Sequence, residues 1–109
     1  MDGNERADKV LIANVDIPQA NKEVAWALPK NCQWFTLQTR DGTPIRLAVE
    51  SGHVANSQPP YFTLKADNAW DERYLDIDTR YGLKLFFACS LAGKVVEAIL
   101  GIYDGGGEG

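Results

Sequence analysis

The sequence has few of the residues from which common catalytic and metal sites are built. It contains one histidine and two cysteines among 109 residues. The phosphate-binding, dinucleotide-binding, zinc-protease and nucleophile-elbow motifs are all missing. Cys32 and Cys89 lie far apart with no C-x-x-C or Cys/His spacing, so two buried, reduced thiols are favoured over a zinc site or a disulfide. The sequence therefore predicts no enzyme and no cofactor.

Long apolar runs and basic clusters are also missing. No stretch of about 18 apolar residues is present, so no membrane span is expected. The first residues, MDGNERADK, lack the apolar core of a signal peptide, and we expect residues 1–8 to form a polar N-terminal arm. Fifteen acidic and eleven basic residues give a net charge of −4. Without clustered Lys and Arg to neutralise phosphates, neither a nucleic-acid nor a membrane partner is expected.

Regular alternation of apolar and polar residues fills the stretches between turn signals. This period of two is typical of half-buried β-strands, and no segment predicts a helix. The expected strands are 9–15, 22–28, 35–39, 45–49, 61–65, 81–87 and 96–102. Their spacing predicts one all-β domain over residues 9–103, a single-domain antiparallel sandwich or compact barrel of about seven strands. A flexible Gly-rich tail is expected at residues 104–109.

Two tight hairpins are expected within this domain. In the first, Leu37 faces Ile45 across the loop RDG, whose glycine can take the left-handed conformation that closes such a loop. In the second, Phe87 faces Val96 across the loop SLAG, which also ends in glycine. The run at 9–15 is apolar enough to be buried on both faces, and as an edge strand it could extend a neighbour's sheet.

Aromatic side chains and an acidic segment are the candidates for contact with a partner. Trp26 alternates with apolar residues and is expected in the core, whereas Trp34 falls on the opposite face of its strand from Phe35. Trp70 lies in the segment 67–78, which carries five carboxylates and one arginine. That segment lacks EF-hand spacing, so a solvated acidic loop is favoured over a calcium site. The expected interface residues are Trp34, Trp70, Tyr61, Asp71 and Glu72.

Three stretches carry a resemblance to a known family. They are FTLQTRDGTPIRLAVESGHVA at 35–55, PYFTLKADNAWDE at 60–72 and LKLFFACSLAGKVVEAIL at 83–100. These stretches resemble small virion structural proteins of tailed bacteriophages, of the capsid decoration or accessory type. The resemblance implies an all-β protein that assembles with capsid or other virion proteins, often as a homo-oligomer, in particles built in the host cytoplasm. It supplies no catalytic residues.

Three classes of function follow from these observations. We expect a non-enzymatic structural protein that decorates or stabilises a phage particle through protein–protein contacts. The alternative is a carbohydrate-binding β-sandwich that stacks sugar rings on the same exposed aromatic side chains. An enzyme built around His53 is the least favoured, because its neighbours Glu50 and Ser51 point to opposite sides of an extended chain and form no relay.

Overall fold

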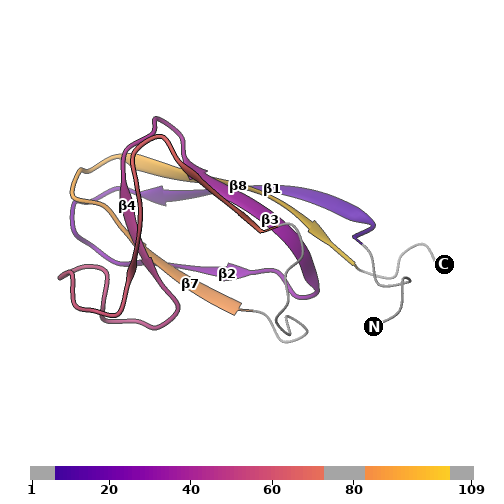
Figure 1. Cartoon of the computed structure of the whole chain (residues 1–109), viewed down its shortest axis with the longest axis horizontal. Helices are drawn as coiled ribbons and strands as arrows, with labels where there is room; N and C mark the ends of the chain where they lie inside the picture. Colours follow the sequence, from indigo (N-terminus) through magenta and orange to yellow (C-terminus); the bar gives the residue numbers. More distant parts are fainter. Residues whose placement is uncertain (1–6, 73–82, 104–109) are drawn as a thin grey trace.

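Two four-stranded antiparallel sheets pack against each other in the computed structural model (Figure 1), which describes residues 7–72 and 83–103. The strands are β1 (Lys9–Ile17), β2 (Val24–Leu28), β3 (Cys32–Thr39), β4 (Ile45–Ala48), β5 (Phe62–Leu64), β6 (Ala69–Glu72), β7 (Leu83–Ala88) and β8 (Lys94–Ile102). The first sheet has the order β1-β8-β3-β6 and the second has the order β2-β7-β4-β5. The predicted all-β antiparallel fold is confirmed, with eight described strands.

The chain passes from one sheet to the other at nearly every connection. Among the described strands, only β4 and β5 are both consecutive and in the same sheet. The other strands alternate in the order that arises when a long hairpin wraps around a barrel axis, which is the jelly-roll arrangement. One consequence matters for the site: β5 and β6 are edge strands of the two sheets, and β1 and β2 are the opposite edges.

Neither predicted hairpin forms, because each of the two turns connects strands of different sheets. β3 pairs with β6 and β8, whereas β4 pairs with β5 and β7, so Leu37 does not face Ile45 in a ladder. In the same way, β7 and β8 lie in different sheets, so Phe87 does not pair with Val96 in a ladder. Alternation shows which side chains point inward, and it does so equally for paired strands and for strands that face each other across a core.

The turns themselves have the predicted conformations. Gly42 has φ of 80° and Gly93 has φ of 75°, both in the left-handed region that favours glycine. The Gly42 amide donates to the Thr39 carbonyl at 3.1 Å, which closes the turn after β3. The Gly93 amide donates to the Ile17 carbonyl at 3.0 Å, which ties the turn before β8 to the end of β1. Turn chemistry therefore determines the glycine conformations but not the pairing of the strands that the turns connect.

The core lies between the sheets and contains most of the inward residues that alternation predicted. Phe35 and Leu37 from the first sheet and Leu85 and Phe87 from the second are all fully buried. Trp26 is partly buried and stacks on Phe87 at a centroid distance of 6.3 Å, so it belongs to the core margin. The predicted faces of β3 and β7 are confirmed.

Two segments differ from their expected environments. The run at 9–15 is not buried on both faces: β1 is an edge strand, and Val10 and Ile12 are 59% and 73% exposed on its outer face. The acidic segment 67–78 was expected as a loop, but its first part forms β6, which is the additional strand. Residues 73–78 lie outside the described residues, as do residues 1–6 of the expected arm and the tail at 104–109.

Cys32 and Cys89 are both buried free thiols. Cys32 Sγ donates to the Trp34 carbonyl at 3.3 Å, and Cys89 Sγ donates to the Pro44 carbonyl at 3.5 Å. Burial raises the pKa of the Cys32 thiol and outweighs the opposite effect of its hydrogen bond. Cys32 therefore remains a protonated thiol at neutral pH.

The loop between β4 and β5 is held against the outer face of the second sheet. Arg46 Nε donates to the Val54 carbonyl at 2.6 Å, and its Nη2 donates to Asn21 Oδ1 at 2.9 Å. Glu23 Oε1 accepts a hydrogen bond from the Gly52 amide at 2.9 Å. Val54 is fully buried in a small second cluster of apolar residues. These contacts fix the ends of β4 and β5, from which the candidate site is built.

Candidate functional site

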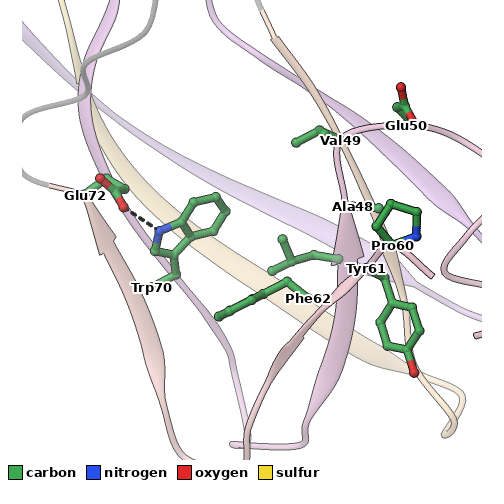
Figure 2. Close-up of a pocket in the computed structure, with 9 residues that line it drawn as sticks. Ala48, Val49, Glu50, Pro60, Tyr61, Phe62, Trp70 and Glu72 are labelled. Carbon is green, nitrogen blue, oxygen red and sulfur yellow. Dashed lines mark hydrogen bonds between the residues drawn. The ribbon is translucent and has the colours of Figure 1, made fainter.

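An apolar groove of about 560 Å³ opens between the edge of the second sheet and the edge of the first (Figure 2). β4 and β5 supply one wall and β6 supplies the other. The lining residues are Leu47, Ala48, Val49, Glu50, Pro60, Tyr61, Phe62, Trp70 and Glu72. Seven of these nine side chains carry no formal charge and are apolar or aromatic, so the groove suits a hydrophobic group better than a polar one.

Trp70 anchors the β6 wall to the core. Its position on β6 lies opposite Leu37 of β3, so its side chain points inward at an open edge. The indole meets Phe35 edge-on, with centroids 4.9 Å apart and planes at 85°, a favourable aromatic arrangement. The indole Nε1 donates to Glu72 Oε1 at 2.9 Å, which satisfies its polar atom (Figure 2). Part of the Trp70 ring therefore packs on the core, and the rest lines the groove.

Phe62 forms the opposite wall and points toward Trp70 in Figure 2, with ring centroids 6.5 Å apart. It is 58% exposed, although it is a large aromatic residue on a strand. Val49, just beyond the end of β4, is 60% exposed at the same opening. Tyr61 points away from Trp70 and packs on the cluster around Val54, so it supports the groove from below.

Two carboxylates lie among the lining residues. Glu72 is held by the Trp70 indole, and Glu50 is near His53, with Glu50 Oε1 and His53 Nε2 3.7 Å apart. His53 Nδ1 is 2.9 Å from the Gln58 carbonyl, so this nitrogen carries the proton and donates to it. That hydrogen bond joins two parts of the loop, which is a structural task. The groove therefore combines an apolar lining with negative charge.

The structure brings together three of the five expected interface residues. Tyr61, Trp70 and Glu72 line the groove. Asp71 lies on the opposite face of β6, where its Oδ1 accepts a hydrogen bond from Thr36 Oγ1 at 2.8 Å. Trp34 also lies on the outer face of the first sheet, opposite Gly101 on β8, whereas its neighbour Phe35 points inward and contacts Trp70. The expected single interface is thus divided between two surfaces.

The second surface lies on the outer face of the first sheet. Val10 pairs with Gly101, Ile12 pairs with Ile99, and Gly101 also pairs with Trp34. Ile99 is 42% exposed, beside the more exposed Val10 and Ile12. We call these four side chains, Val10, Ile12, Ile99 and Trp34, the outer apolar patch.

Gly101 makes the position of Trp34 possible. A Cβ atom at residue 101 would collide with the indole Nε1 and Cε2 atoms of Trp34, and it would also meet the side chain of Ala7. The indole therefore lies directly over the backbone of β8, and the strand has no room for a side chain at this place.

The other end of the same face is polar. Glu97 on β8 accepts hydrogen bonds from Arg40 Nε at 2.7 Å and from Gln38 Nε2 at 3.3 Å. These two bonds, the Arg40 bond foremost, lower the pKa of the Glu97 carboxyl. Arg40 Nη2 also donates to Asn14 Oδ1 at 3.2 Å, so the network extends to the edge strand β1. The outer face of the first sheet is therefore apolar at one end, at the outer apolar patch, and polar at the other end, around Glu97.

Several groove and patch residues are not among the expected interface residues. Phe62 lies in an expected strand, but β5 is only three residues long, and its alternation does not show which side chains are exposed to solvent. Val49 continues the alternation of Ile45 and Leu47, which predicts an inward side chain, but β4 ends at Ala48 and the chain turns outward there. The signal for the outer apolar patch is present in the sequence: an apolar run at 9–15 is also what an exposed edge strand with an apolar outer face produces.

Membrane-spanning helices and metal-binding clusters of side chains are two further features that bear on function. No helix in residues 7–72 and 83–103 is long and apolar enough to cross a membrane. Within the same ranges, no group of three or more His, Cys, Asp or Glu side chains is placed to hold a metal ion.

Comparison with known proteins gives no match to the chain among family models, curated proteins or solved structures. The groove and the outer apolar patch are therefore interpreted from their own geometry.

Proposed function

We propose that this protein is a non-enzymatic structural subunit of a phage particle, which decorates or stabilises the capsid through protein–protein contacts at the apolar groove. The observation that carries the proposal is the groove itself, where Phe62 and Val49 are largely exposed beside a firmly anchored Trp70. Exposed aromatic residues beside a rigid wall are typical of the centre of a protein interface.

The phage context is supported by the family resemblance. Residues 35–55 and 60–72, which carry two of the three resembling stretches, supply every residue that lines the groove. The resemblance and the groove thus point to the same part of the chain.

The chemistry of the groove defines its partner. An apolar side chain of a capsid protein would enter between Phe62 and Trp70 and exclude water from both. A basic residue next to that side chain would then meet the carboxylates of Glu50 and Glu72. The proposed occupant is therefore an exposed loop of a virion protein that carries a hydrophobic residue beside Lys or Arg.

Co-sedimentation with empty capsid shells of the phage that encodes the chain tests this function. Phe62→Ser removes the exposed groove wall, and Leu91→Ser is the matched control, because Leu91 is 54% exposed in the turn before β8. We expect the wild type and the Leu91 variant to sediment with the shells and the Phe62 variant to stay behind. Equal sedimentation of both variants, or none by the wild type, would contradict the proposal.

A carbohydrate-binding module is the second candidate, because Trp70, Phe62 and Tyr61 gather at one place. Sugar rings stack on aromatic faces, but their hydroxyls also need polar partners. The groove offers mainly the carboxylates of Glu50 and Glu72 for that purpose, which favours the protein partner. A glycan array decides between them: specific binding that is lost on Trp70→Ala or Trp34→Ala would support the sugar site.

A further inference from the structure

β1 is a long edge strand with an apolar outer face. It covers Lys9–Ile17, and among the described strands only β8 pairs with it. Val10 and Ile12 project from the outer face and are 59% and 73% exposed. Natural edge strands are usually short or protected by charge on such positions, because an open edge is a template for another strand.

We propose that β1 pairs with β1 of a second copy of this chain, antiparallel about a two-fold axis at Leu11. The two first sheets then join into one continuous sheet with the two β1 strands at its centre. This inference rests on the proposed function, since it supplies the symmetric assembly by which the subunit would act on a particle, and it assigns that role to a surface other than the groove.

The register follows from the side chains of β1. Opposite residues in an antiparallel pair lie on the same face of the sheet. A two-fold axis perpendicular to the sheet must therefore lie between one residue and the same residue of the second copy, and we name each axis by that residue. An axis at Leu11 places Val10 opposite Ile12 of the second copy, and it does so twice. Two β-branched side chains facing each other across strands are a favourable pair.

Other registers place unlike or repelling groups opposite each other. An axis at Ile12 puts Asp8 opposite Asp16 of the second copy, which sets two carboxylates against each other. An axis at Ala13 puts Val10 opposite Asp16, and an axis at Val10 puts Asp8 opposite Ile12. Among these axes, only the one at Leu11 matches both apolar side chains.

Charge complementarity supports the same register. The axis at Leu11 places Asp8 opposite Asn14 of the second copy. Asn14 Oδ1 already accepts a hydrogen bond from Arg40 Nη2 at 3.2 Å, so the guanidinium lies beside the place that the Asp8 carboxylate reaches. At each end the pairing therefore brings the Asp8 carboxylate near the Arg40 guanidinium, which also binds Glu97 through its Nε atom, and it sets no two like charges directly opposite each other within residues 8–14.

The contact extends the outer apolar patch across the axis. Within one copy, Trp34, Gly101 and Val10 form a row across three strands, and Ile12 lies beside Ile99 in the next row. Pairing at Leu11 joins the first row of one copy to the second row of the other. Because only strand edges meet, the buried area falls below the roughly 800 Å² per partner of a standard interface, so a weak dimer is expected.

Disulfide cross-linking in solution tests the register. Val10→Cys and Ile12→Cys are made as separate full-length variants, mixed at high concentration and treated with diamide. Directly opposite positions are about 5 Å apart between Cα atoms, whereas diagonal ones are about 7–8 Å apart, beyond the reach of a disulfide. We expect several-fold more dimer in the mixture than in either variant alone. The native Cys32 and Cys89 are buried, which keeps the background low.

Equal cross-linking in the mixture and in either single variant would overturn the register, and no cross-linking in the mixture would overturn the dimer. Light scattering gives a second measurement. The mean mass of the wild type should rise with protein concentration, and the mean mass of the Ile12→Lys variant should stay at the value of a monomer. A wild-type mass that stays monomeric would also overturn the inference.

The outcome is separable from the capsid test. Phe62→Ser lies at the other edge of the sandwich and should leave cross-linking unchanged. Capsid binding without cross-linking would overturn the dimer alone, and cross-linking without capsid binding would overturn the proposed function alone.

Discussion

Replacement of Trp70 by alanine should destabilise the fold as well as weaken any contact at the groove. Truncating a fully buried aromatic residue costs about 3–5 kcal/mol. Trp70 is only partly buried, but it loses its edge contact with Phe35 and its hydrogen bond to Glu72. We therefore expect a loss of about 2 kcal/mol in the free energy of unfolding. For a domain of this size that corresponds to a fall of about 10 °C in Tm.

Thermal unfolding followed by circular dichroism measures this loss, with two variants for comparison. Trp70→Phe keeps an aromatic ring against Phe35 and loses the indole hydrogen bond and part of the ring area, so its Tm should fall by less than that of Trp70→Ala. Phe62→Ser changes a ring that is 58% exposed, and its Tm should remain near that of the wild type. A Trp70→Ala variant as stable as the wild type would refute the packing of Trp70 on the core.

Three further predictions concern the scaffold. Gly42→Ala should lower the free energy of unfolding by about 1–3 kcal/mol in denaturant titrations, because residue 42 has φ of 80° and a Cβ atom there would displace the Asp67 carboxylate. The hydrogen bond from Lys94 lowers the pKa of Asp41 below its ordinary 3.8, so its stabilising effect is present above that pH and is lost as the pH falls below it. Lys94→Met should therefore flatten the loss of stability measured by urea titration between about pH 4 and pH 2. Cys32 and Cys89 should react with a thiol reagent only at the rate of unfolding, because both are buried.

The faces of the strands could be predicted from the sequence, but their partners could not. The alternation of Phe35 and Leu37 identified core side chains, because a period of two is a local property of the backbone. The choice between a hairpin and a crossing of the sheets depends on where all the other strands lie. Gly42 and Gly93 satisfy a tight turn in both cases, so they carry no information about that choice.

The site could be predicted only in part, for a related reason. Trp70 stands out because tryptophan is rare and large, and Tyr61 and Glu72 line the same groove in the folded chain. Phe62 could not be singled out, because its exposure results from the position of β5 at the edge of a sheet. Trp34 was expected at the same surface as Trp70, but it lies on the outer face of β3, whereas Trp70 points inward from the neighbouring strand β6, so the first sheet itself separates the two side chains.

The separation of the two surfaces has a consequence for assembly. β1 lies at one edge of the first sheet and β6 at the other, so self-pairing at β1 leaves the groove beside β6 open in both copies. On the proposed function, a dimer would thus present two grooves to a capsid surface. Two linked sites bind a repeating surface more tightly than one, by a factor on the order of 10²–10⁴ when the geometry allows both to engage. A weak dimer is sufficient for this, because once both grooves are bound the capsid itself holds the two copies together. Ile12→Lys should therefore reduce capsid binding without altering the groove, and it should do so most strongly at low protein concentration.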